Sequence, residues 1–151
     1  MSKNFEYYKG SLEQFISWVN STKGILKKCI IADISQELID HVSALGLDLD
    51  GHYKHIVDNS AVNHIQKQHG GAKEYLRGQL PVTMDDWEHI PKILKEYNSL
   101  IVSENAIGNP VLIYTFETDD AILHYVEEIR KGRKELATCT LYKTKKETHR
   151  R

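Results

Sequence analysis

The sequence predicts a single α+β domain in which N-terminal helices pack on a C-terminal antiparallel sheet of about four strands. Apolar residues recur at helical spacing in the first part of the chain, whereas β-like runs follow one another after Leu100. The chain has 151 residues, the usual size for one hydrophobic core, and its composition of 40% apolar and 27% charged residues is typical of a globular protein. Helices first and strands last is the layout of an α+β fold.

Four helical segments are expected, and in each of them an apolar stripe follows a residue that can cap the first turn. In order, they are residues 11–20 with Gly24 as the end, a helix from Ser35 to Gly46, a helix from Asp58 or Ser60 to the Gly70–Gly71 pair, and residues 81–97 with Thr83 as the cap. Pro91 is expected to break or restart the last helix, because proline lacks the amide hydrogen that a helix needs.

Apolar and β-branched runs predict strands at residues 27–33 and 51–57, and three further strands after Leu100. These three are residues 111–117, 121–130 and 135–143. A short turn, Lys131–Lys134, joins the last two into a hairpin, with Gly132 where a positive φ costs little. Residues 121–133 could alternatively form a helix, because their side chains also tolerate that conformation.

The predicted hairpin has one polar and one apolar face, because side chains alternate along a strand. The polar face is expected to hold Tyr125, Glu127, Ile129, Leu136, Thr138, Thr140 and Tyr142, and the apolar face Ile122, Val126, Ala137, Cys139 and Leu141. The apolar face is the natural core side. The polar face could stack bases on its rings and hold phosphates with nearby cations. An ordinary solvent-facing sheet is the alternative, since Thr and Tyr favour strands in any case.

Charge is unevenly distributed along the chain. The net charge is -1, yet residues 130–151 carry nine Lys or Arg against two Glu. That segment is therefore +7, which leaves -8 for the other 129 residues. A basic end on an acidic body favours a local site for a polyanion. A solvated, frayed tail is the alternative.

The sequence predicts a cytoplasmic protein without a membrane partner. No stretch approaches the roughly 20 apolar residues of a membrane-spanning helix. The first ten residues carry Lys3, Glu6 and Lys9 and lack the apolar centre of a secretory signal. Cys29 and Cys139 each lie in an apolar run, so they are interpreted as small core residues rather than as a disulfide pair.

Two histidines, His64 and His69, lie in the motif HIQKQHG at the end of the third predicted helix. Positions five residues apart on a helix point about 140° apart, whereas two zinc ligands on one helix prefer a spacing of four. Ile65 also stands where a zinc protease has its glutamate. His69 shares one face of the predicted helix with Val62 and Ile65. A purely structural interpretation is therefore that His69 packs in the core and that His64 lies on the surface. The functional interpretation is that these histidines transfer protons, because the side-chain pKa of histidine lies near neutrality.

A metal site shared by several histidines is a further alternative. It would use His52, His55, His64 and His69. Residues 52 and 55 point to opposite faces of the predicted strand, which makes a shared ion awkward. No metal and no other cofactor is therefore predicted.

The order of these features resembles the phage-encoded nucleases of the barnase, EndoU, colicin and RelE superfamily. The similar segments are HIQKQHG, WEHIPKILKEY at residues 87–97, and YVEEIRKGRKELATCTLYK near the C-terminus. The resemblance covers about residues 25–145, so residues 1–24 are interpreted as a helical extension and residues 146–151 as a basic tail. It implies a four-stranded antiparallel sheet with helices on one side and an RNA-cleaving site on the open face.

The resemblance also implies a reaction without metal. A base removes the proton of a ribose 2′-OH, the oxygen attacks the adjacent phosphorus, and an acid protonates the departing 5′-oxygen to leave a 2′,3′-cyclic phosphate. By their match to the family's motifs, His64 and His69 are expected to transfer these protons, in an order left open. Thr138 and Thr140 match the terminal threonine position and are expected to hydrogen-bond the phosphate.

Cations must balance the charge that develops on the phosphate. Arg130 and Lys134 are the expected cations, with Arg133 as a substitute. The remaining substrate-binding candidates lie on the predicted polar face, and they are Tyr125, Glu127 and Tyr142. Glu127 is also an alternative base, although an ordinary surface carboxylate is the plainer interpretation.

These expectations describe a toxin-like endoribonuclease, with RNA as substrate and an immunity or antitoxin protein as a further partner. A free ribonuclease in the cytoplasm would damage its host, so an inhibitor or delivery into another cell is expected. The alternative function is a non-catalytic RNA-binding or phage accessory domain with the same fold, which needs the basic face but neither histidine.

Overall fold

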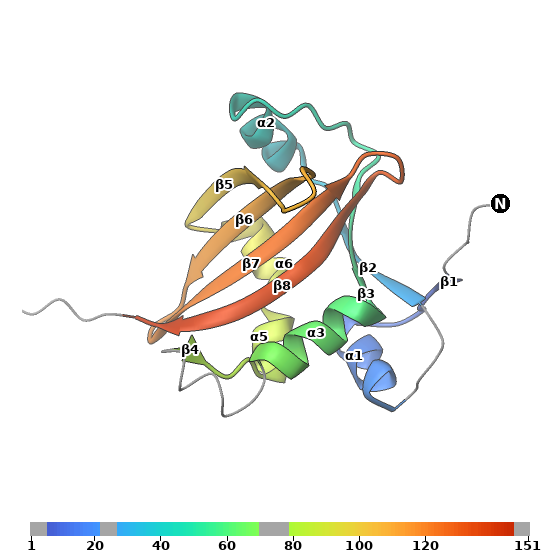
Figure 1. Cartoon of the computed structure of the whole chain (residues 1–151), viewed down its shortest axis with the longest axis vertical. Helices are drawn as coiled ribbons and strands as arrows, with labels where there is room; N and C mark the ends of the chain where they lie inside the picture. The colour runs from blue at the N-terminus through green and yellow to red at the C-terminus, as the bar shows by residue number, and fades with distance from the viewer. Residues whose placement is uncertain (1–5, 22–26, 70–78, 147–151) are drawn as a thin grey trace, which may run out of the picture.

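The computed structural model describes residues 6–21, 27–69 and 79–146, apart from the side chains of Glu6, Gln68 and His69. One mixed sheet runs through this part of the chain (Figure 1). Its strands, in spatial order, are β1 (Glu6–Tyr7), β2 (Lys27–Asp33), β3 (Lys54–Asp58), β8 (Glu135–Lys145), β7 (Ala121–Arg130), β6 (Pro110–Glu117) and β5 (Ser99–Glu104), while β4 (Gln79–Leu80) pairs with β8 beside this path.

The α+β prediction is confirmed, but the sheet is larger than the four strands expected. Seven strands follow one another across the sheet, because β1, β2 and β3 of the N-terminal part extend the antiparallel β5–β8 unit. The seam between the two parts is a parallel pairing of β3 with β8 at Lys54–Ile56 and Glu135–Ala137. β5 was not expected, since the strand prediction began only at Val111.

Five described helices accompany the sheet. They are α1 (Leu12–Ser21), α2 (Gln36–Ala44), α3 (Asn59–His69), α5 (Met84–Glu88) and α6 (Ile90–Glu96). The caps explain where they begin: Ser35 accepts from Leu38 N, Thr83 forms a capping box with Asp86, and Asp58 rather than Ser60 accepts from Ala61 N at the start of α3. Pro91 lies in the first turn of α6, so it restarts the helix.

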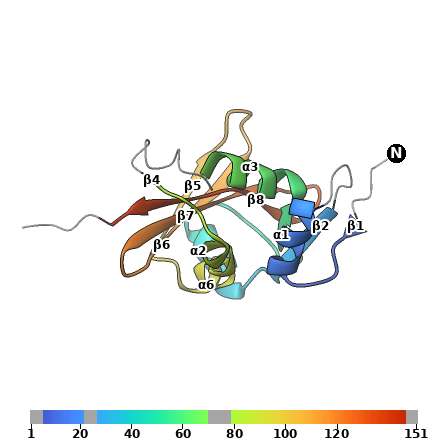
Figure 2. The ribbon, with the colours of Figure 1, turned by 90° about the horizontal axis from the view of Figure 1, so that it is seen from below.

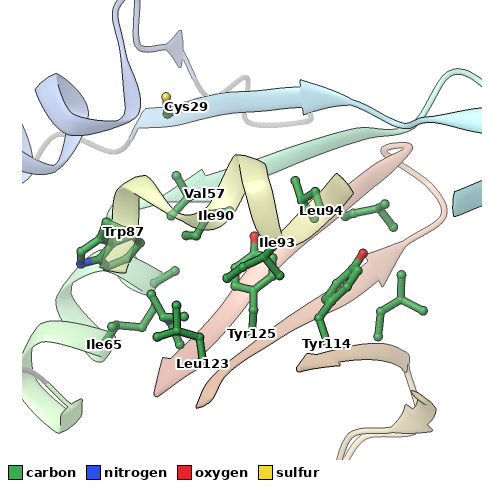
Figure 3. Packing of buried hydrophobic residues seen from close by; sticks show 14 of the residues in the cluster. Cys29, Val57, Ile65, Trp87, Ile90, Ile93, Leu94, Tyr114, Leu123 and Tyr125 are labelled. Atoms are coloured by element: carbon green, nitrogen blue, oxygen red, sulfur yellow. The ribbon is translucent and has the colours of Figure 1, made fainter. Parts of the chain in front are cut away.

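The core lies between the sheet and the helices. In Figure 2, α2 and α6 lie below the ribbon of β7 and β8, and α3 lies above it. Figure 3 shows Ile65 of α3 and Trp87 of α5 approaching Leu123 of β7. All three are buried, and α1 joins the same core through Phe15, Ile16 and Val19. The predicted N-terminal extension therefore packs on the core of the rest of the chain.

α3 takes the place of a strand beside the middle of β8. Residues 135–137 of β8 pair with β3, and Lys143 and Thr144 pair with β4. α3 also packs against β8 (Figure 1). Because α3 begins where β3 ends, the chain passes directly from the sheet seam to the helix that carries His64 and His69.

The hairpin of β7 and β8 forms as predicted, with Arg130 opposite Glu135, and the helical alternative for residues 121–133 is wrong. The positive φ of its turn is at Lys134 (55°) rather than at Gly132. A β-bulge interrupts the register, because Glu127 pairs with Thr138 whereas Val126 pairs with Thr140. Cys139 is the extra residue, a free and half-buried thiol, and Cys29 is a free thiol in the core.

The predicted faces of the hairpin are wrong for β7 and for the part of β8 before the bulge, whereas Leu141 lies in the core as expected. Tyr125, Glu127 and Thr138 point into the core, together with Ile129 and Leu136. The opposite, open face carries Ile122 and Val126, which were expected in the core, and because of the bulge it also carries Thr140 and Tyr142. The alternation was inverted because three polar side chains of this hairpin are buried and hydrogen-bonded to one another.

Candidate functional site

A row of polar side chains crosses the open face of the sheet. Ser99 of β5 lies opposite Thr115 of β6, Thr115 opposite His124 of β7, and His124 opposite Tyr142 of β8. Residues directly opposite in antiparallel strands project from the same face, so all four lie side by side. Ser99 and Thr115 are joined by a hydrogen bond between their hydroxyls. The row ends at β8, where α3 packs.

His124 is the most tightly held side chain of this row. Its ring stacks on Tyr142 with centroids 4.4 Å apart and planes 2° from parallel. Its Nε2 lies 3.0 Å from the hydroxyl oxygen of Thr144. Burial lowers the pKa of His124 below its ordinary value, because the charged form loses hydration. A neutral imidazole therefore stands in the middle of the open face at neutral pH.

Thr138 and Thr140 lie on opposite faces of β8, so the bulge separates two residues that were expected to act together. The Thr138 hydroxyl donates to Ile56 O at 3.0 Å and hydrogen-bonds the Tyr125 hydroxyl at 2.6 Å. It holds β8 to β3 and has no access to the open face. Thr140 Oγ1 is buried and has no hydrogen-bond partner among the described residues.

A second buried oxygen without a partner in the described part of the chain is Gln79 Oε1. Gln79 lies opposite Thr144, the residue that hydrogen-bonds His124. A buried polar atom without a partner is costly, by about 1–3 kcal/mol, and often marks a functional position. Two such atoms, on Gln79 and Thr140, therefore flank the His124–Tyr142 stack along β8.

The two histidines of the HIQKQHG motif both lie on α3. The His64 side chain is exposed, and Ile65 beside it is fully buried against the core. The side chain of His69, the last residue of α3, lies outside the described residues. The helix as a whole packs along β8, the strand of Thr140 and Tyr142.

Tyr125 and Glu127 belong to a buried cluster rather than to a substrate surface, and both side chains are inaccessible to solvent. Glu127 accepts hydrogen bonds from Tyr114 and Tyr125 and pairs with His55. Because His55 is committed to that carboxylate, it is not available to a surface metal site. Among the described residues, no group of three or more His, Cys, Asp or Glu is arranged to hold a metal ion.

The cations lie around the hairpin turn, where a cavity of about 560 Å³ opens. Its lining includes Asn109, Glu128, Arg130, Lys131 and Arg133. Arg130 Nε donates to Glu128 Oε1 at 3.0 Å, and the amides of Asn109 and Asn105 donate to Glu128 Oε2. These hydrogen bonds, first that of Asn109 and then that of Arg130, lower the pKa of Glu128. The cavity is thus lined by three cationic side chains, Arg130, Lys131 and Arg133, and by one carboxylate whose two oxygens both accept hydrogen bonds.

Lys134 points elsewhere. Its Nζ lies 2.5 Å from Asp50 Oδ2 and 5.2 Å from the centroid of the Tyr53 ring. The hydrogen bond and charge of Asp50 raise the pKa of Lys134. Since Asp50 and Tyr53 belong to the segment between α2 and β3, Lys134 fastens that segment to the hairpin and does not join the cavity.

The structure thus packs α3, the helix of His64 and His69, against β8, the strand of Thr140 and Tyr142. It places Arg130 and Arg133 at the hairpin turn and removes Tyr125, Glu127, Thr138 and Lys134 from the open face. Sequence reasoning missed His124 and Gln79. Alternation on β7 already put His124 on the same face as Val126, but that face was taken for the core.

A comparison with protein families identifies the family of the chain. Residues 31–151 match the family described as phage-Barnase-EndoU-ColicinE5/D-RelE like nuclease3. The chain belongs to this family. The resemblance inferred from the motifs is thereby confirmed, and with it a nuclease of phage-associated type. Searches of curated proteins and of solved structures gave no match.

In this chain, residues directly before residue 31 pair with the part of the structure that matches the nuclease family. β2 pairs with β3 along its length, and Lys28 of β2 lies 2.9 Å from Glu135 of β8. None of the described helices combines the length and apolarity that crossing a membrane requires.

Proposed function

We propose that this nuclease is an endoribonuclease that cleaves RNA without a metal ion. The bond between the ribose 2′-oxygen and the adjacent phosphorus forms while the bond from phosphorus to the 5′-oxygen breaks. A base takes the 2′-OH proton, and an acid gives a proton to the departing 5′-oxygen. The products are a 2′,3′-cyclic phosphate and a free 5′-hydroxyl.

Histidine is suited to both proton transfers, because its pKa lies near neutrality. His64 and His69 of α3 are the family-matched candidates, and the exposure of His64 supports access to substrate. Thr140 and Tyr142 are proposed to hydrogen-bond the phosphate or stack on a base, from the strand against which α3 packs. Arg130 and Arg133 are proposed to bind phosphates of the same strand of RNA.

The observation that carries this proposal is the packing of α3 along β8, beside the open face. A helix with two histidines is thereby fixed next to a strand whose hydroxyls project from a sheet face that no other described helix covers. Proton donors and acceptors, phosphate ligands and cations then lie on neighbouring elements, as acid–base cleavage of a phosphodiester requires.

The test is turnover of a structured RNA in EDTA. We expect the parent protein to produce fragments with 2′,3′-cyclic phosphate ends, and to leave untouched an RNA with 2′-deoxyribose at each cleavage position. His64→Ala or His69→Ala should slow cleavage by about 100-fold or more, because general acid–base catalysis contributes that much. His52→Ala is the matched control, since His52 is exposed in the segment between α2 and β3.

The outcome also separates the alternative function. Binding of RNA by the parent without any cleavage, unchanged in both histidine variants, would favour a non-catalytic RNA-binding or phage accessory domain. Cleavage that stops in EDTA and returns with added magnesium would contradict the metal-independent mechanism.

We also propose that the protein acts in the cytoplasm and is held in check by an immunity or antitoxin protein. A ribonuclease that needs neither a metal ion nor another cofactor would attack the host that makes it. Induction in bacteria should therefore arrest growth with the parent sequence and not with a His64→Ala/His69→Ala double variant. Equal tolerance of both proteins would remove the reason for an inhibitor.

A further inference from the structure

Cleavage of one phosphodiester needs two proton-transferring groups, and among the described side chains α3 offers one of them, His64. Ile65, the next residue in the sequence, is fully buried against the core, and His64 is exposed. A base and an acid must reach the two oxygens on either side of one phosphorus, so the open face beside α3 is the place to look for a second proton-transferring group.

We propose that His124 of β7 is a catalytic residue of the nuclease, and that it transfers one of the two protons while a histidine of α3 transfers the other. This inference rests on the proposed ribonuclease function and deepens it. The ribose would lie over the β8 side of the open face, between His124 and α3, with Tyr142 beneath it.

Register places His124 correctly for this role. It lies directly opposite Tyr142, while Thr140 is opposite Val126, the next residue on the same face of β7. His124 and Thr140 are therefore diagonal neighbours on the open face, and β8 alone separates His124 from α3. This face has Thr140 Oγ1 and Gln79 Oε1 as hydrogen-bonding atoms without a partner in the described chain.

The ring is already oriented before any substrate arrives. Tyr142 fixes its plane, and Thr144 Oγ1, 3.0 Å from Nε2, fixes its rotation. With Nε2 engaged by the Thr144 hydroxyl, the ring is held in place, and the imidazole can exchange a proton with little reorganisation. Thr144 is thus a positioning residue, because it acts on the substrate only through His124.

The surroundings keep the ring neutral at the pH of the reaction. Burial lowers the pKa of His124. The titratable groups nearest to it on the same face are Tyr142 on β8 and Glu117 on β6, which lies opposite Ile122 and pairs with Lys146. Farther along this face, toward the hairpin turn, lie Glu128, Arg130 and Glu135, of which Arg130 pairs with both carboxylates. Since the neutral form is the one that accepts a proton, these conditions suit His124 to the base role, with the acid on α3.

The test compares the parent, His124→Gln, Thr144→Val and His52→Ala on two substrates in EDTA. One is a dinucleoside phosphate with a natural 5′-linked nucleoside, and the other carries para-nitrophenol as the leaving group, which needs no acid. Glutamine keeps a polar atom near Thr144 but cannot exchange protons at neutral pH. We expect His124→Gln to lower kcat about 100-fold or more, with little change in KM.

The pattern across the substrates assigns the role. A loss on both substrates, with loss of the acidic limb of the pH–rate profile, identifies the base, and a loss confined to the natural substrate identifies the acid. Thr144→Val should lower kcat less and shift the acidic limb, an effect that a merely structural role would not produce. His52→Ala should match the parent.

The inference is overturned if His124→Gln keeps kcat within about twofold of the parent on both substrates while His64→Ala or His69→Ala abolishes cleavage. It is also overturned if the loss of kcat in His124→Gln equals the fraction of this variant that is unfolded, and if Thr144→Val leaves the pH–rate profile unchanged. Failure of the proposed function looks different, because then the parent and His52→Ala do not cleave either substrate.

Discussion

His55 of β3 and Glu127 of β7 meet inside the core, with Nδ1 2.7 Å from Oε2. Both are buried, at 2% and 0% exposure. Tyr114 donates to Glu127 Oε1 at 2.6 Å and Tyr125 donates to Oε2 at 3.2 Å, so the carboxylate is well satisfied. Burial, and then the charge of Glu127, raise the pKa of Tyr114 and of Tyr125 far above the usual range, which keeps both phenols as donors.

This cluster predicts strong coupling between its members. His55→Leu or Glu127→Leu alone should lower the free energy of unfolding by about 3–5 kcal/mol, because each leaves buried polar groups without their partner. The double variant should be destabilised by clearly less than the sum, since both single changes break the same His55–Glu127 interaction, which the double variant loses only once. Urea denaturation of the four proteins measures this. Simple additivity would show that the two side chains do not depend on each other.

A second buried pair joins the N-terminal part to the hairpin. Lys28 Nζ lies 3.0 and 2.9 Å from the two carboxylate oxygens of Glu135, and both residues are buried. Lys28→Met should therefore cost about 3–5 kcal/mol of stability, because Glu135 keeps a buried charge without its main partner. Lys54→Met is the matched control on the neighbouring strand: its pair with Asp33 is exposed and should contribute about 0–1 kcal/mol.

The two lysine variants are compared by chemical denaturation at neutral pH. Equal losses of unfolding free energy in Lys28→Met and Lys54→Met would show that burial does not make the Lys28–Glu135 pair more important for stability than the exposed pair. A large effect of Lys28→Met would mean that residues outside the matched family segment, which begins at residue 31, contribute to the stability of the nuclease domain.

Local signals predicted most of the elements, because they depend on neighbours in sequence. Ser35 and Thr83 cap their helices as expected, and Pro91 restarts one. β1 and β4 have only two residues each and give no periodic pattern. The parallel pairing of β3 with β8 could not be predicted. It joins residues about 80 positions apart in the sequence, and sequence patterns report only on neighbouring residues.

The site was harder to predict, because its geometry depends on one extra residue in β8. The bulge at Cys139 puts Thr138 in the core and Thr140 on the open face, whereas strict alternation keeps the two together. The face itself was inverted because Tyr125 and Glu127 look like surface residues until their partner His55 is known. Short motifs gave the family and the α3 histidines, but His124 belongs to no motif and was found only through its register.

The carboxylate of Glu128 predicts a dependence of stability on pH. The hydrogen bonds from Asn109, Arg130 and Asn105 lower its folded pKa below the ordinary value of 4.5. The ionised form is thus favoured by folding, so its contribution is present above that ordinary value and is lost as the pH falls toward the folded pKa. Glu128→Gln should be less stable than the parent at pH near 7, and the difference should shrink in acid below about pH 4.5.

The matched control for Glu128→Gln is Glu104→Gln on β5, two strands away in the sheet, where the side chain is exposed. It should change the midpoint of unfolding little at any pH. Thermal melting of the three proteins from acidic to neutral pH gives the comparison. A destabilisation by Glu128→Gln that stays constant down to acid would contradict the role of the ionised carboxylate in bracing Arg130 beside the cavity.

The cations at the hairpin turn predict how RNA binding depends on salt. Lys131 and Arg133 line the cavity, whereas Lys134 is paired with Asp50 on another side of the turn. For a 2′-O-methyl RNA that cannot be cleaved, Lys131→Ala and Arg133→Ala should each weaken binding and reduce the slope of log K against log salt concentration by about 0.7, the value for one phosphate contact on a single strand. Lys134→Ala, an equal change of charge in the same turn, should leave the slope nearly unchanged. Fluorescence anisotropy over a series of salt concentrations measures these slopes, and an equal reduction in all three variants would indicate general attraction to a basic end instead of binding at the cavity.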